Sequence, residues 1–175
     1  MKILKLFLLS PLLFLGSCFD DDTNYKDYAE WREENIKYIQ LAETETVDGH
    51  LRYEKIIPQW DKSVFSLIEW HNDKNQNTGS IYPLSNSTVD VKYLLTNIKG
   101  DTLDSSSSFR CRPGNMITGF CIALTNMLPG DSVTAVIPSD AGYGASSYGS
   151  VLPYSTLIFN IRLDSIVDYE TLPWR

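Results

Sequence analysis

The chain has 175 residues, of which 43% are apolar and 12% aromatic, enough for the core of one medium-sized domain with short appendages. A formal net charge of −7 and the lack of a basic patch argue against nucleic acid as a partner. The two histidines, His50 and His71, do not stand in a metal-ligand spacing, so the sequence predicts neither a metal site nor a cofactor.

The first seventeen residues have the pattern of a secretory signal peptide. Two lysines precede an almost wholly apolar run at 6–15, and small residues stand before Cys18. The apolar run is shorter than the roughly 20 residues that a membrane-spanning helix needs. The ending Leu15-Gly16-Ser17-Cys18 resembles a bacterial lipobox, in which the cysteine becomes the first mature residue and carries acyl chains. We expect removal of residues 1–17 and lipidation of Cys18; an ordinary signal peptide with a chance cysteine is the alternative.

Residues 18–24 are expected to form an acidic tether, because Phe19 and then three aspartates follow the cysteine expected to carry lipid. Such a run resembles the surface-export signal of some Gram-negative lipoproteins, with a solvated linker as an equal alternative. We therefore expect a lipid anchor in the cell envelope of a Gram-negative bacterium, at the outer membrane, facing the periplasm or the cell surface. This compartment is oxidising. For Cys111 and Cys121 the sequence favours two buried thiols over a disulfide, whose geometry the spacing does not establish.

Residues 25–47 are expected to hold an amphipathic helix. Tyr28, Trp31, Asn35 and Ile39 recur at three- and four-residue steps, and acidic residues stand early in the segment, as suits a helix N-terminus. This stripe predicts docking onto the downstream domain, with binding of a separate partner as the alternative.

Further along, short apolar runs alternate with turn signals. In 88–95, apolar side chains alternate with others in the pattern of a half-buried strand, and Leu128-Pro129-Gly130-Asp131 ends a short helical run. One short helix among several antiparallel strands predicts an α+β fold. We expect strands at 51–58, 64–70, 88–95, 132–137 and 157–163, one helix at 116–127, and loops at 71–87, 105–108 and 139–156.

A series of short motifs runs through residues 88–166. They are Tyr93 with Gly100, Leu103-Asp104-Ser105-Ser106, Phe109 with Gly114, Met116-Ile117-Thr118-Gly119-Phe120, Met127-Leu128-Pro129-Gly130-Asp131, Ala141-Gly142-Tyr143-Gly144, Leu152-Pro153 and Thr156-Leu157-Ile158-Phe159. In order and spacing they resemble the motifs of the FKBP family of peptidyl-prolyl isomerases. The resemblance implies a bent antiparallel β-sheet wrapped around one short α-helix. The domain would span 48–168, with an insertion at about 59–86 and a tail at 169–175.

The resemblance also implies a substrate-binding bowl. Phe120 would be its floor, and the Ile117 N–H and the Tyr143 hydroxyl would donate to substrate carbonyls. Asp104 would be the carboxylate at the rim, beside Tyr93, so that Tyr93, Asp104 and Tyr143 are the expected catalytic set. The other expected substrate-binding residues are Leu103, Phe109, Met116, Tyr148, Leu152 and Phe159. The alternative for the strand residues Tyr93 and Phe159 is a purely structural place in the core.

Two positions depart from the family pattern. Phe120 stands where the family usually has the tryptophan of the floor. Leu103 stands where the family has a wall phenylalanine before the aspartate, and this change predicts weaker catalysis. We expect a monomeric prolyl isomerase that assists folding of exported proteins by acting on their proline-containing segments. The main alternative is a non-catalytic FKBP-like module that binds peptides or proteins, which a bowl covered by residues 59–86 would favour. Glycan binding at Trp60 and Trp70 is a minor alternative, for which a buried pair is the simpler account.

Overall fold

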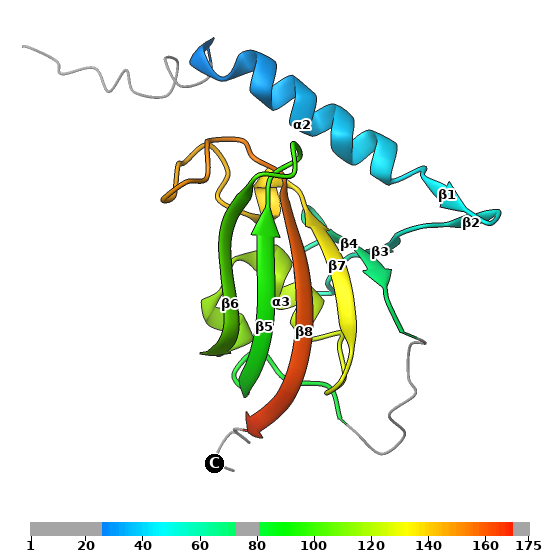
Figure 1. The fold of residues 1–175 in the computed structure, drawn as a ribbon, viewed down its shortest axis with the longest axis vertical. Coiled ribbons are helices and arrows are strands. Elements are labelled where there is room, and N and C mark those ends of the chain that lie inside the picture. Colours follow the sequence, from blue (N-terminus) through cyan, green and yellow to red (C-terminus); the bar gives the residue numbers. More distant parts are fainter. Residues whose placement is uncertain (1–25, 73–80, 170–175) are drawn as a thin grey trace, which may run out of the picture.

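The computed structural model describes residues 26–72 and 81–169 (Figure 1). The signal peptide, Cys18 and the acidic tether that the sequence predicts lie outside the described residues. The helices are α2 (Ala29–Ala42) and α3 (Thr118–Leu124), with the short 3-10 helices η1 (Pro113–Asn115) and η2 (Ser139–Ala141). The strands are β1 (Thr46–Val47), β2 (His50–Leu51), β3 (Glu54–Ile56), β4 (Ser66–Trp70), β5 (Thr88–Thr96), β6 (Thr102–Cys111), β7 (Ser132–Ile137) and β8 (Leu157–Asp168). No helix in the described ranges is long and apolar enough to cross a membrane.

Six strands form one antiparallel sheet in the order β3-β4-β7-β8-β5-β6, while β1 and β2 make a small hairpin of their own. The sheet bends around α3, which lies against one of its faces (Figure 1). The α+β fold with one short helix inside a bent antiparallel sheet is therefore confirmed. β8, the last strand along the chain, lies in the interior of the sheet between β7 and β5.

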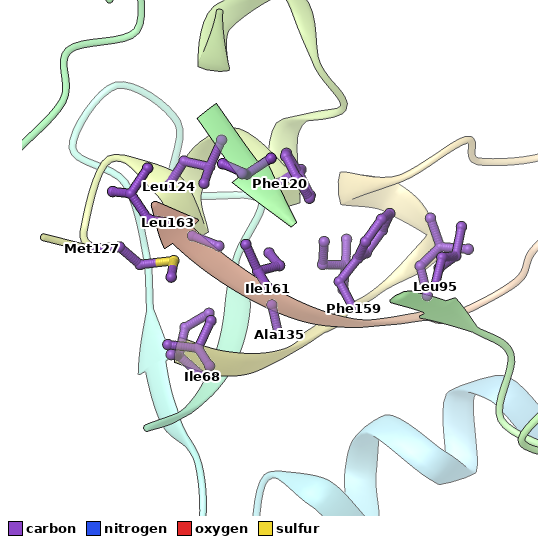
Figure 2. Packing of buried hydrophobic residues seen from close by; sticks show 14 of the residues in the cluster. Ile68, Leu95, Phe120, Leu124, Met127, Ala135, Phe159, Ile161 and Leu163 are labelled. Carbon is purple, nitrogen blue, oxygen red and sulfur yellow. The ribbon is translucent and has the colours of Figure 1, made fainter. Parts of the chain in front are cut away.

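The face of the sheet toward α3 carries the main core. Alternation places one apolar row across four strands, in the registered positions Ile68, Ala135, Phe159 and Leu95. From the other side, α3 contributes Phe120 and other buried side chains to the same cluster (Figure 2). This row is what the alternating pattern of 157–163 predicts.

The opposite face carries a smaller apolar cluster. Leu67 of β4 pairs with Val136 of β7, and both side chains pack with Tyr53 and with Ala42 at the end of α2. The C-terminal half of α2 thus covers part of the outer face of the sheet. The structure places the predicted helix there and gives it a contact with the downstream domain.

Two predictions of single elements were wrong in detail. Residues 105–108, expected to be a loop, lie within β6, where Ser105 pairs with Leu94 and Ser106 with Tyr93. Serine has a low β propensity, but pairing with a long neighbouring strand overrides it. The expected strand 51–58 is divided between β2 and β3. The strand expected at 64–70 is confirmed as β4, an integral strand of the sheet that lies within the region expected as an insertion.

The central helix is shorter than expected and β8 is longer. Instead of 116–127, α3 covers Thr118–Leu124. The side chains of Thr125 and Asn126 donate to the carbonyls of Cys121 and Ile122, at 2.8 Å each, in the last turn. Such local side-chain bonds compete with continuation of the helix.

Candidate functional site

Four aromatic rings meet where β5, β6, α3 and β8 converge: Tyr93, Phe109, Phe120 and Phe159, here called the aromatic cluster. The centroid of the Tyr93 ring lies 5.5 Å from that of Phe109, 6.1 Å from that of Phe120 and 5.9 Å from that of Phe159. Phe120 and Phe159 meet edge to face at 4.9 Å. Edge-to-face pairs at these distances add stability beyond the apolar area that they bury.

The floor of this cluster is covered. Phe120 exposes 1% of its surface and Phe159 exposes 7%, and both side chains point into the core (Figure 2). Tyr93 and Phe109 are only partly buried and lie at the border of the core. A substrate side chain can therefore reach the Phe120 ring only after neighbouring side chains move.

Tyr93 and Asp104 are joined at the edge of the cluster. The Tyr93 hydroxyl donates to Asp104 Oδ2 at 2.7 Å, and the Ser105 N–H donates to Asp104 Oδ1 at 2.8 Å. Partial burial, followed by the hydrogen bond to the Asp104 carboxylate, raises the pKa of Tyr93 to about 12. The Tyr93 phenol therefore stays a protonated donor at neutral pH, and each oxygen of the Asp104 carboxylate accepts a hydrogen bond.

Two hydrogen-bond donors beside the cluster have no partner among the residues that the structure describes. Ile117 precedes α3, and Tyr143 lies in the loop 139–156; both side chains pack against the main core. Within the described residues, neither the Ile117 N–H nor the Tyr143 hydroxyl makes a hydrogen bond. Burial is the main cause that raises the pKa of Tyr143, which keeps its hydroxyl protonated. Both groups are free to donate to a ligand.

The loop 139–156 supplies the outer edge of the site. The rings of Tyr143 and Tyr148 stack at 4.8 Å with an angle of 8° between their planes. Tyr148 exposes 65% of its surface and Leu152 exposes 45%, and Tyr148 forms an isolated β-bridge with Val151. The structure thus brings Tyr148 to Tyr143, while Leu152 lies in the adjoining turn.

Leu103 and Met116 occupy the remaining predicted wall positions. Both are partly buried and pack against the main core. Leu103 lies in β6, next to an irregularity in the pairing of β5 with β6. The side chain is therefore on the expected side of the strand, but without the flat surface of an aromatic ring.

A groove that sequence reasoning missed lies next to Met116. Its volume is about 370 Å³, and its lining includes Trp60, Ser85 and Cys121. The Gly114 N–H donates to the Ser85 carbonyl at 2.7 Å, which holds the segment before β5 beside η1. The simpler expectation of a buried tryptophan pair was wrong for Trp60, which is 67% exposed. The rarity of exposed tryptophan was the misleading signal.

Both described cysteines are free thiols, as the sequence favours, but their side chains are partly rather than fully buried. Cys111 lies at the end of β6, where burial raises its pKa to about 11. Cys121, in α3, also has a pKa raised by burial. In the described part of the chain, no group of three or more His, Cys, Asp or Glu side chains is arranged to hold a metal ion.

Comparison with known families gives one match to a family model. Residues 79–164 match the model of the FKBP-type peptidyl-prolyl cis-trans isomerase. Among curated proteins, the chain is 39% identical over 59 residues to peptidyl-prolyl cis-trans isomerase FKBP15-3 of Arabidopsis thaliana, a match that covers 34% of this chain and 41% of that protein. It is 30% identical over 104 residues to FkpA of Escherichia coli, covering 51% and 38%. The chain thus spans about two fifths of each of these two relatives.

Shorter relatives and solved structures extend the comparison. FK506-binding protein 1 of Saccharomyces cerevisiae is 24% identical over 127 residues, which is 69% of this chain and 96% of that protein. The crystal structure of FkpA from Escherichia coli superposes with a TM-score of 0.70 at 22% identity, covering 85% of this chain and 65% of that one. A peptidyl-prolyl cis-trans isomerase from Pseudomonas syringae gives a TM-score of 0.59 at 22% identity, covering 86% and 98%. These two structures support the fold.

Proposed function

Because the chain belongs, through residues 79–164, to the family of FKBP-type peptidyl-prolyl cis-trans isomerases, we propose that it catalyses rotation about X-Pro peptide bonds in exported polypeptides. The observation that carries this proposal is a pair of donors beside the aromatic cluster, the Ile117 N–H and the Tyr143 hydroxyl, which are unpaired within residues 26–72 and 81–169. An apolar site with a few free, oriented donors is the arrangement that binding of a peptide segment needs.

The chemistry requires no nucleophile. Rotation about the X-Pro bond crosses a barrier of roughly 18–20 kcal/mol, which amide resonance sets. The twisted amide has lost this resonance and is less polar than the planar one, so an apolar surface favours it over the planar ground state. The donors of Ile117 and Tyr143 would hold the substrate carbonyls while the aromatic cluster receives the proline ring. Because Phe120 is covered, we expect neighbouring side chains to shift when substrate binds.

Asp104 acts in this scheme through Tyr93. Its carboxylate accepts from the Tyr93 hydroxyl and so fixes the phenol ring against Phe109 and Phe120. The same hydrogen bond positions the Asp104 carboxylate, which is exposed, at the rim of the site. Tyr93 would therefore serve as a wall of fixed orientation.

Two observations favour the second candidate function, a non-catalytic module that binds extended or proline-containing segments. Leu103 stands where the family has an aromatic wall, and the Phe120 floor exposes only 1% of its surface. Both features weaken the discrimination between planar and twisted amide on which catalysis depends, but they leave the donors of Ile117 and Tyr143 available for peptide binding.

A soluble form that starts after Cys18, assayed on a set of X-Pro peptides, separates the two functions. We expect it to accelerate isomerisation, which takes tens to hundreds of seconds without catalysis. Tyr143→Phe should lower kcat/KM by about two- to twelvefold, because it removes one hydrogen bond worth about 0.5–1.5 kcal/mol. Tyr38→Phe, which removes a hydroxyl from α2, is the matched control. Equal background rates for the wild type and a Tyr143→Phe, Asp104→Val double variant would exclude the isomerase, and peptide binding without catalysis would support the binding module.

We further propose that the chain works as a monomer anchored by a lipid on Cys18 in the envelope of a Gram-negative bacterium, at the outer membrane. The lipobox-like Leu15-Gly16-Ser17-Cys18 supports this proposal. Incorporation of labelled fatty acid that persists after Cys18→Ala would contradict it.

A further inference from the structure

We propose that helix α2 positions the loop 139–156, which carries Tyr143 and Tyr148, and that Asn35 is the positioning residue of this contact. The inference rests on the proposed function, because it concerns the geometry of the same site. It adds a positioning element from outside the matched region 79–164, since α2 comes from the preceding segment.

Three consecutive residues at the end of this loop are each contacted by one residue of α2. The Trp31 indole N–H donates to Ser155 Oγ at 3.1 Å, and the Thr156 N–H donates to Asn35 Oδ1 at 2.6 Å. The guanidinium carbon of Arg32 lies 5.6 Å from the ring centroid of Tyr154. Residues more than 120 positions apart in the sequence are thus bound side by side.

Asn35 is the centre of this contact. It is 2% exposed, and both ends of its amide are used: Nδ2 donates to the Trp31 carbonyl at 2.7 Å while Oδ1 accepts from Thr156. The Thr156 hydroxyl also donates to the Asn35 carbonyl at 3.4 Å. Removing one partner from a buried, satisfied pair leaves the other unpaired, so this contact is costly to break.

The end of the loop is connected directly to the candidate site. The Tyr154 N–H donates to the carbonyl of Gly144 at 2.7 Å, and Gly144 follows Tyr143 in the chain. Tyr154 itself has φ of 61°, in the left-handed region that is rare for a residue other than glycine. Such a backbone persists only where its surroundings impose it. Here Arg32 and Gly144 hold Tyr154 from two sides.

The helix is fixed to the sheet independently of the loop. Ile39 and Ala42 pack in the smaller apolar cluster on the outer face of the sheet, and Glu34 pairs with Lys99, in the turn between β5 and β6, at 2.7 Å. Figure 1 shows α2 lying across the end of the sheet from which the loop 139–156 projects. The helix therefore connects the sheet to the end of a loop whose Ala141 and Val151 are also buried in the main core.

The test compares Asn35→Leu with Gln40→Leu in the soluble chain. Both replace an amide on α2 by an apolar side chain, but Gln40 is exposed and makes no side-chain bond to the loop 139–156. At a temperature where both variants are folded, we expect Asn35→Leu to lower kcat/KM on X-Pro peptides about tenfold, less than the hundredfold that a 1 Å misplacement can cause. Gln40→Leu should keep the wild-type value.

Amide hydrogen exchange tests the same contact without relying on catalysis. In Asn35→Leu, we expect faster exchange at Tyr154 and Val151 in the loop, while Ala135 and Phe159 in the centre of the sheet keep wild-type rates. An active wild type with an unaffected Asn35→Leu variant would overturn the inference, and so would equal acceleration in loop and sheet. If the wild type has no isomerase activity, the proposed function fails, and loop exchange alone decides whether α2 positions the loop.

Discussion

Replacing Gly119 by alanine tests how closely α3 packs on β7. A Cβ atom built at Gly119 would overlap Ile137 Cγ2 and would stand 2.9 Å from Cγ1 and 3.0 Å from Cβ of the same residue. Ile137 is fully buried in β7, and its branch point is fixed by the strand. The new methyl group therefore meets atoms that cannot turn away as the end of a flexible side chain does.

Two opposing terms set the size of the effect. Glycine to alanine within a helix favours folding by about 1 kcal/mol. Overpacking a dense core typically disfavours folding by about 1–3 kcal/mol, and the overlap here places the cost at the upper end of that range. We expect Gly119→Ala to lower the free energy of unfolding by about 1–2 kcal/mol, measured by urea denaturation.

A double-mutant cycle with Ile137 shows whether the overlap is the cause. Ile137→Ala removes both Cγ atoms and leaves only the Cβ contact at 3.0 Å, so in that background Gly119→Ala should be close to neutral, the remaining contact offsetting the gain in helix propensity of about 1 kcal/mol. Ile137→Val keeps both Cγ atoms and is the matched control, in which Gly119→Ala should still destabilise. An equal loss of stability in all three backgrounds would refute the packing argument.

Two further predictions concern titratable groups. The pKa of Tyr93 is raised from 10.0 to about 12, so the stabilisation that this phenol contributes is complete below pH 10 and is lost as the pH rises through 12. Asp104→Asn should lower this pKa, as measured by NMR titration of labelled tyrosine. An unchanged pKa in this variant would contradict the role of the carboxylate. Burial raises the pKa of Cys111 to about 11, and the thiolate is the form that reacts with iodoacetamide. At neutral pH, Cys111 should therefore react much more slowly in the folded chain than in the urea-unfolded chain. Equal rates would contradict its burial.

The sequence predicts the parts of the fold that alternate clearly. Val89 and Val91 in β5, and Leu157, Phe159, Ile161 and Leu163 in β8, point to the core as their spacing predicts. It does not predict that Ser105 to Ser108 continue β6, because serine has little preference for strands and the pairing with β5 comes from the fold.

The candidate site divides in the same way. Motif order brings Tyr93, Phe120 and Phe159 to one place, and the structure unites their rings. Sequence reasoning does not reach the near-complete burial of Phe120, which depends on packing from several elements. Nor does it reach the bond between Asn35 and Thr156, because no local pattern connects residues separated by 121 positions.

The interior position of β8 has a consequence for how the protein folds. Its partners are β5, where Thr96 pairs with Ile158, and β7, where Ile137 pairs with Leu157. Pairing β8 with β5 closes a loop of more than sixty residues. Such contacts between distant residues slow folding, because the chain loses the entropy of loop closure before the contacts stabilise it. Until β8 arrives, β5 and β7 each present an unpaired edge to other chains. We therefore expect truncation of β8 to leave two partial sheets with exposed edges, β3-β4-β7 and β5-β6. We also expect the domain to be prone to self-association until the chain is complete.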